Sequence, residues 1–205
     1  ASSELNLTVD TTAPAQPTIT TTTILTSNST STIEGEAEAG STVELFDGSA
    51  SLGTTTADAA GNFSITKTFS DGNYSLTVKA RDAAGNISPA SSELNLTVDT
   101  TAPAQPTITT TTILTSNSTS TIEGEAEAGS TVELFDGSAS LGTTTADAAG
   151  KFLIEFTTPT LSDNNYSLTV KATDAAGNIS EESDGIVPAQ PTITTTTSLT
   201  NSATP

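Results

Sequence analysis

The chain of 205 residues contains no cysteine, no histidine, no methionine and no tryptophan. Without cysteine it has no disulfide and no thiol chemistry. Without histidine it lacks the commonest general base and the commonest ligand for transition metals. It also has no uninterrupted apolar run of about eighteen residues, so we expect no insertion into a membrane. From the missing methionine we expect a mature product or a segment of a longer protein.

Basic residues are also scarce. Five Lys and Arg stand against 24 Asp and Glu, which gives a formal net charge of −19. Binding to the phosphate backbone needs a basic surface, so we expect no nucleic-acid partner. A chain this acidic repels itself unless cations intervene. Its hydrophobic content of 33% is low for a globular protein, but the apolar residues are ordered in a strand-like pattern, which indicates a folded chain.

The sequence is a tandem repeat. Residues 1–61 recur letter for letter at 90–150, and a third copy begins with "PAQPTITTTTSLT" at 188–200. A repeat of this length has the size of a small independent domain. We therefore predict four segments: residues 1–10 as the last strand of a preceding repeat, 11–99 as one domain, 100–187 as a second domain with a shortened last strand, and 188–205 as the first strand of a following repeat.

Short runs with period-two alternation indicate strands throughout each repeat. In "YSLTVKARD" the apolar residues from Tyr74 onward share one face, and Lys79 and Arg81 lie on the opposite face. The runs "ELNLTVD", "STVELFD" and "NFSIT" alternate in the same way, and no segment keeps a helical period. The pattern is typical of an all-β sandwich of about seven strands. In the first full repeat we expect these at residues 16–25, 30–38, 42–47, 51–57, 63–69, 73–81 and 91–98.

The pattern "IEGEAEAGSTVELFDG" followed by "DAAGNFSIT", "DGNYSLTVKARDAAGNIS" and "LTVDTTAP" resembles a bacterial Ig-like domain. It is similar to the tandem Ig-like repeats of giant adhesins and biofilm-associated proteins of Gram-negative bacteria. Tyr74 and Tyr166 resemble the tyrosine corner of such sandwiches. The resemblance implies an extracellular, rod-like stalk exported by a type I system. It also implies Ca²⁺ at domain junctions, contacts with neighbouring Ig-like repeats, and adhesion by other, terminal domains.

The expected strand order places three acidic loops at one end of each sandwich. Because successive strands alternate in direction, the 36–41, 58–62 and 82–86 loops lie at the end where "VDTTAP" enters. Crowded carboxylates repel one another unless they are protonated or bridged. Without His or Cys, a hard, oxygen-bound cation such as Ca²⁺ is the metal that the sequence suits. The predicted ligands are Asp10, Glu38, Asp58 and Asp82 at the first junction, and Asp99, Glu127, Asp147 and Asp174 at the second.

A simpler interpretation applies to the same loops. The phrase "DAAGN" occurs at 58–62, 82–86 and 174–178, and "DAAGK" at 147–151. Asp at the first position accepts a backbone N–H, and Gly supplies a positive φ, so each copy forms a turn without any metal. Lys151 beside a cation is unfavourable, so the 58–62 type of loop is a weaker metal candidate than the 82–86 type. Asp47 and Asp71, in "DG" turns at the other end, are interpreted most simply as turn residues. A contribution from the neighbouring domain stays open for them.

We expect no enzyme, because a carboxylate site would be duplicated almost unchanged with no His, Cys or Trp to shape it. The predicted function is a structural stalk or spacer of a secreted bacterial cell-surface adhesin, stiffened by Ca²⁺ at its junctions. The alternative is a self-assembling extracellular fibre, a homopolymer in which residues 1–9 of one chain complete the second repeat of another. A glycan-binding module is disfavoured because aromatic residues are few.

Overall fold

The computed structural model describes residues 7–110, 119–157 and 167–186. All regular elements in these ranges are β-strands, so no described segment is a helix long and apolar enough to cross a membrane. The chain divides into two compact units, Ala1–Pro103 with Thr173–Ile179 and Ala104–Ala172 with Ser180–Pro205. The predicted all-β sandwich class is confirmed.

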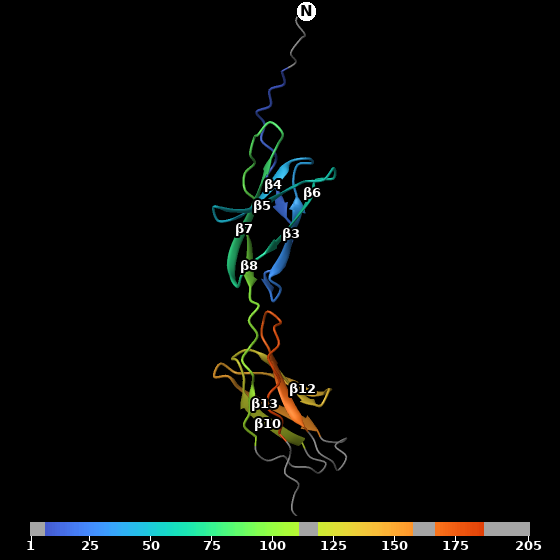
Figure 1. Ribbon diagram of the computed structural model, residues 1–205, viewed down its shortest axis with the longest axis vertical. Helices are drawn as coiled ribbons and strands as arrows, with labels where there is room; N and C mark the ends of the chain where they lie inside the picture. Colours follow the sequence, from blue (N-terminus) through green and yellow to red (C-terminus); the bar gives the residue numbers. More distant parts are fainter. Residues whose placement is uncertain (1–6, 111–118, 158–166, 187–205) are drawn as a thin grey trace, which may run out of the picture. The chain divides into compact units, whose positions relative to one another are not determined.

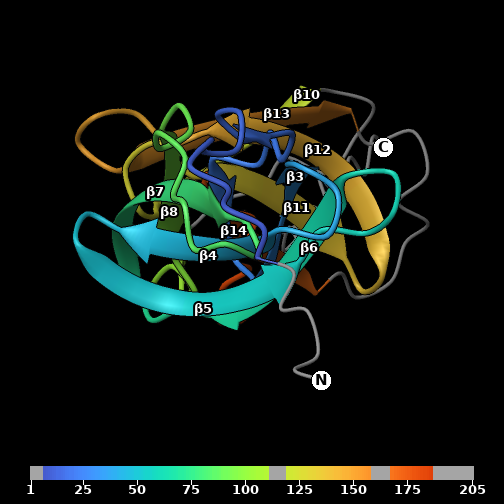
Figure 2. The ribbon, with the colours of Figure 1, turned by 90° about the horizontal axis from the view of Figure 1, so that it is seen from above.

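The first sandwich consists of two sheets (Figure 1). One has the order β1-β3-β6 and the other the order β2-β8-β7-β4-β5. Figure 2 shows β4 and β5 side by side, as their antiparallel pairing requires. The strands are β1 (Thr18–Ile19), β2 (Leu25–Thr26), β3 (Thr30–Glu36), β4 (Thr42–Asp47), β5 (Ala50–Thr56), β6 (Asn62–Thr68), β7 (Gly72–Arg81) and β8 (Leu94–Val98).

The core lies between these two sheets and is built by the alternation seen in the sequence. Val43 and Leu45 of β4 lie beside Leu76 and Val78 of the neighbouring strand β7, and all four are fully buried. Ile33 of the opposite sheet closes the core from the other side. Burying one such side chain contributes about 1.5–3 kcal/mol relative to leaving it exposed. The inward and outward faces are therefore those that period two predicts.

The predicted strand at residues 16–25 is wrong in one respect, because the structure has two short strands there in different sheets. β1 pairs with β3, whereas β2 pairs in parallel with β8. Between them, the N–H groups of Thr20 and Thr21 share the carbonyl of Glu34, and the Thr21 hydroxyl accepts the Glu34 N–H at 2.8 Å. A side-chain oxygen thus replaces a backbone acceptor, and the chain leaves the first sheet.

Two further contacts support the sandwich. The Tyr74 hydroxyl donates to the carbonyl of Ser70 at 2.8 Å, which is the hydrogen bond of a tyrosine corner. Tyr166 lies outside the described residues. At Gly35 an added Cβ would lie 2.0 Å from the carbonyl oxygen of Thr18 and 2.5 Å from the ring of Phe63, so only glycine fits between the strand and the ring.

The second sandwich repeats this pattern, with the described sheets ordered β13-β10-β9 and β12-β11-β14. Its strands are β9 (Thr107–Ile108), β10 (Thr119–Glu125), β11 (Thr131–Asp136), β12 (Ala139–Thr145), β13 (Lys151–Thr157) and β14 (Leu168–Thr173). In place of β8, Ile186 makes an isolated antiparallel bridge with Leu168. Within residues 167–186 this bridge is what the structure describes of the last strand. The predicted shortening and the predicted segment boundaries stay predictions.

Candidate junction site

The four copies of the D-A-A-G-N/K phrase close in the same way. The carboxylate of the first residue accepts the backbone N–H of the fifth, and Gly at the fourth position takes a positive φ, +90° at Gly61. The distances from the fifth N–H to Oδ1 are 2.8 Å at Asp58, 2.8 Å at Asp82, 2.9 Å at Asp147 and 2.9 Å at Asp174. The prediction that all four are turns is confirmed.

The hydrogen bonds favour the ionised form of three of these carboxylates, those of Asp58, Asp82 and Asp174. At Asp58, the backbone hydrogen bond from Asn62 lowers the pKa, against a smaller effect of burial that raises it. At Asp82, the side-chain hydrogen bond from Asn86 is the main cause of a lowered pKa. At Asp174, burial raises the pKa, but the hydrogen bonds from the 174–178 loop outweigh it, and the pKa falls. In these three turns the lowered pKa keeps the carboxylate ionised to a lower pH than in a free aspartate.

The 82–86 loop also contacts the incoming DTTAP segment, residues 10–14. The side-chain amide of Asn86 donates to Asp82 Oδ2 at 2.8 Å and to the carbonyl oxygen of Asp10 at 3.1 Å. The carboxylate of Asp10 accepts the N–H of Thr12 at 2.9 Å. One amide thus joins the carboxylate of the loop to the backbone of the segment.

The second DTTAP segment, residues 99–103, is held by the same contact. The amide of Asn178 donates to Asp174 Oδ2 at 2.8 Å and to the carbonyl oxygen of Asp99 at 2.7 Å. The 173–179 stretch and the 99–103 segment belong to the same compact unit. Because the sequence singled out the acidic residues, it missed the asparagines, although Asn closes both loops of this type at the fifth position.

The other predicted ligands lie in the two neighbouring loops. The 36–41 and 58–62 loops are joined by the Ala37 N–H donating to the Gly61 carbonyl at 2.8 Å, and Glu38 and Asp58 are exposed beside that contact. Residues 127 and 147 repeat the arrangement in the second sandwich. Within the described ranges, no group of three or more Asp, Glu, His or Cys side chains lies close enough to hold a metal ion. The predicted ligand set stays a prediction.

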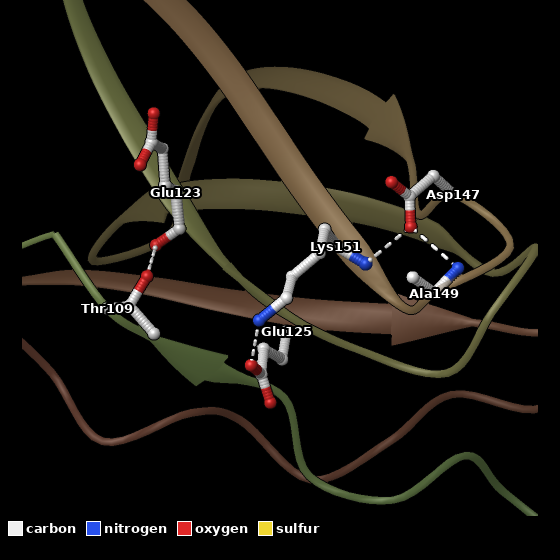
Figure 3. Close-up of polar contacts among 6 residues, drawn as sticks. All are labelled: Thr109, Glu123, Glu125, Asp147, Ala149 and Lys151. Carbon is white, nitrogen blue, oxygen red and sulfur yellow. Dashed lines mark hydrogen bonds and ion pairs between the residues drawn. The ribbon is translucent and has the colours of Figure 1, made fainter.

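Lys151 takes the place of Asn62 in the second sandwich. Its ammonium forms an ion pair with Glu125, while its backbone N–H donates to Asp147 (Figure 3). The side chains of Lys151 and Glu125 are 59% and 55% exposed, so the pair adds little stability. The Lys151 ammonium therefore lies on β10 and not on the carboxylate of Asp147. The expectation that this loop is the weaker metal candidate stays a prediction.

Asp71 has a role that the sequence interpretation missed. Its Oδ1 accepts both the N–H and the hydroxyl of Thr100, at 2.9 and 2.7 Å, and its Oδ2 accepts the hydroxyl of Thr101 at 2.8 Å. These bonds, led by that of the Thr100 side chain, lower the pKa of Asp71. The signal was present in the sequence, because a "DG" turn before the strand and the threonines after the last strand lie at the same end of a sandwich.

The structure defines an Ig-like β-sandwich that occurs twice. Residues 4–100 match the family model described as "Bacterial Ig-like domain", and residues 102–189 match the one described as "Bacterial Ig domain". The chain belongs to the bacterial Ig-like domains, of which it contains two in tandem. No curated protein matches its sequence.

Solved structures are similar in fold. Fibronectin(III)-like modules of Clostridium thermocellum CbhA share 17% identity, with 84% of this chain and 93% of that chain covered and a TM-score of 0.53. A biofilm-associated protein BSP domain shares 21% identity over 86% of this chain and 30% of that chain, with a TM-score of 0.35. The human OSCAR ligand-binding domain shares 16% identity over 86% and 100% of the two chains, with a TM-score of 0.37. The first of these supports the two-sheet sandwich.

Proposed function

We propose that the chain is an extracellular spacer segment of a bacterial surface adhesin, in which tandem Ig-like domains separate a binding domain from the cell. The observation that carries this proposal is the way the DTTAP segments are held. The side-chain amides of Asn86 and Asn178 donate to the first carbonyl of the two DTTAP segments. The carboxylate of Asp71 accepts the threonine hydroxyls of the second segment. A connection fixed by both side chains and backbone suits a load-bearing repeat better than a flexible tether does.

A spacer with no catalytic task also fits the chemistry of the described surface. The titratable groups with shifted pKa values are four Asp residues, and in each the hydrogen bonds keep the carboxylate ionised. A general acid or base needs the opposite adjustment, towards neutral pH. Their hydrogen bonds therefore fit a structural role, in which they hold the turns and the second DTTAP segment in place.

The test is to place the chain between a bacterial surface anchor and a peptide tag. A spacer predicts that a bulky antibody reaches the tag better with the full chain than after deletion of residues 11–99, one repeat. The chain itself, without the tag, should bind no glycan or cell surface. Saturable binding by the chain alone, with tag access independent of repeat number, would contradict the spacer and indicate a binding module.

We also propose that calcium stiffens the junctions. Two oxygens, the Asp82 carboxylate and the Asp10 carbonyl, converge on the amide nitrogen of Asn86, and the second copy repeats this. Carboxylate and carbonyl oxygens are ligands that calcium takes, and a bound calcium ion would supply a positive charge common to loop and segment. Glu38 and Asp58 would join Asp82 and Asp10 as calcium ligands only if their loops moved closer.

Calcium addition to chelator-treated protein tests this second part. We expect a higher melting temperature and a shift of the side-chain amide signals of Asn86 and Asn178 in NMR spectra. Magnesium at the same ionic strength is the control, because its small octahedral shell suits these loops poorly. Equal effects of the two ions, or none, would rule out calcium stiffening and leave the spacer proposal untouched.

A specific observation also favours the fibre alternative. Leu7 and Val9 are 82% and 74% exposed, whereas their exact copies Leu96 and Val98 are 2% and 1% exposed in β8. In the second sandwich, the described part of the corresponding strand is the single bridge at Ile186. The first segment of one chain therefore has the sequence to fill that position in another.

Light scattering distinguishes the fibre from the spacer. Donor-strand exchange predicts polymers that disappear when residues 1–9 are deleted. A monodisperse chain whose mass is insensitive to that deletion would eliminate the fibre.

A further inference from the structure

Two of the five basic residues stand together on the outer face of β7. Lys79 and Arg81 are exposed and alternate with buried Val78 and Ala80. Within the described ranges, the ion pair found is that of Lys151 with Glu125, so neither Lys79 nor Arg81 has a carboxylate within ion-pair distance. These two cations thus lack a carboxylate partner, although the chain has 24 acidic residues.

Apolar surface surrounds these two cations. The Lys79 ammonium lies 5.5 Å from the ring centroid of Phe46, and Ile87 beside it is 59% exposed. The residues line a groove of about 230 Å³. Glu44, opposite Lys79 in register, also lines this groove, and its carboxylate accepts the Ser51 hydroxyl. Arginine next to aromatic and aliphatic surface is the composition of energetically important interface residues. We call the outer surface at Lys79, Arg81 and Ile87 the basic face.

The outer face of the other sheet carries the complementary charge. Glu34 and Glu36 of β3 are exposed, on either side of buried Gly35, and with Asp58 they line a concavity of about 390 Å³. We call this surface the acidic face. Residues two apart on a strand are separated by about 7 Å. The backbone positions of Glu34 and Glu36 are therefore spaced like those of Lys79 and Arg81.

The second repeat shows that this concavity accepts a cationic side chain. There Lys151, at the position of Asn62, lays its ammonium on Glu125, the counterpart of Glu36 (Figure 3). The second repeat also has Thr173 where the first has Arg81. The first repeat thus has both the basic residue Arg81 and an acidic face without a bound lysine. The second repeat has a threonine in place of the arginine, and Lys151 occupies its acidic face.

We propose that the basic face of one chain docks on the acidic face of a second copy of the same chain. Arg81 and Lys79 meet Glu34 and Glu36 at matching spacing, and Ile87 supplies apolar contact at the edge. Because the two faces belong to opposite sheets of one sandwich, the contact is heterologous, and a pair of chains keeps one free face of each kind. It adds copies side by side, so the function it gives a spacer is lateral association between neighbouring stalks.

Sedimentation equilibrium of the full chain at an ionic strength of about 0.15 M is the direct test. We expect weak, reversible self-association that more salt weakens. Arg81→Thr and Asn62→Lys should each reduce the association constant by about fivefold, which is the upper effect of one exposed charge pair. Both variants install a residue that the other repeat already carries at the corresponding position, so both should fold.

The two variants control for net charge, because Arg81→Thr makes the chain more negative and Asn62→Lys makes it less negative. General repulsion predicts opposite effects, whereas docking predicts the same loss from both. The double variant Lys151→Asn with Thr173→Arg builds a second pair of faces and should strengthen association. A chain that stays monomeric up to about 1 mM, or variants that shift association in opposite directions, would overturn the proposal. Neither outcome bears on the spacer function, and deletion of residues 1–9 separates this contact from strand exchange.

Discussion

Removal of one buried hydroxyl should loosen the edge of β7. Ser91 lies before β8, where the chain follows β7 without forming a regular ladder, and it is 7% exposed. Its hydroxyl accepts the N–H of Val78 at 3.0 Å and donates to the carbonyl of Ser92 at 2.8 Å. Its own N–H donates to the Val78 carbonyl at 2.9 Å. In Ser91→Ala the last bond remains, but the Val78 N–H loses its acceptor.

The magnitude follows from that single orphaned donor. Val78 is fully buried, so its N–H has no access to water in the folded state. A buried donor left without a partner costs about 1–3 kcal/mol. The cavity left by the hydroxyl is small, because alanine keeps the Cβ. We therefore expect the free energy of unfolding of the first sandwich to fall by about 1–3 kcal/mol.

Urea unfolding of the full chain, followed by NMR amide signals, measures this fall for each sandwich separately. The second sandwich is an internal control, because Ser183 there accepts the Val170 N–H at 3.0 Å and is unchanged. Ser92→Ala, at an exposed position, should change stability by less than about 0.5 kcal/mol. A fall below about 0.5 kcal/mol for Ser91→Ala would refute the reasoning, because it would mean that the Val78 N–H finds another acceptor.

Three further outcomes are expected. Gly35→Ala should destabilise the first sandwich by about 1–3 kcal/mol, measured by the same urea titration, since the new Cβ would overlap backbone and an aromatic ring. The pKa of Asp71 is lowered in the folded state, so the stability that Asp71 contributes is complete above its unfolded pKa of about 3.9 and is lost as pH falls through the lower folded value. The amide shift of Thr100 should therefore stay constant down to about pH 4 and change below it. A transition well above about pH 4 would contradict the lowered pKa of Asp71. Lys151→Asn should lower the free energy of unfolding of the second sandwich by less than about 1 kcal/mol in the same urea titration, because the ion pair with Glu125 is exposed. A larger loss would contradict this, because it would mean that the ion pair is stronger than an exposed pair.

The sequence was sufficient for the fold class because burial in a sandwich repeats every second residue. Leu76 and Val78 face inward where the alternation places them. The division of the first predicted strand was beyond reach, since it depends on the Thr21 hydroxyl replacing a backbone acceptor at Glu34. Nothing in a run of threonines tells which hydroxyl turns inward.

The candidate site was predictable in its location but not in its chemistry. Strand direction brought the 82–86 loop to the DTTAP segment, as the contact between Asn86 and the Asp10 carbonyl requires. Attention to charge selected Asp82 and passed over Asn86, although the asparagine makes the connecting bonds. The sequence interpretation placed Asp71 in its turn and did not link it to Thr100, because these bonds span 29 positions of sequence and depend on the three-dimensional fold.

The central claim is that the second DTTAP segment is held by hydrogen bonds of the protein itself. The most direct measurement is the backbone ¹⁵N order parameter of Thr100 and Thr101 in the presence of a chelator. Bonds from Asp71 to both threonines predict values near those of rigid strands, about 0.85. Values below about 0.6 in the chelator would contradict this claim. If they rose only when calcium was added, the rigidity would belong to the proposed calcium site alone.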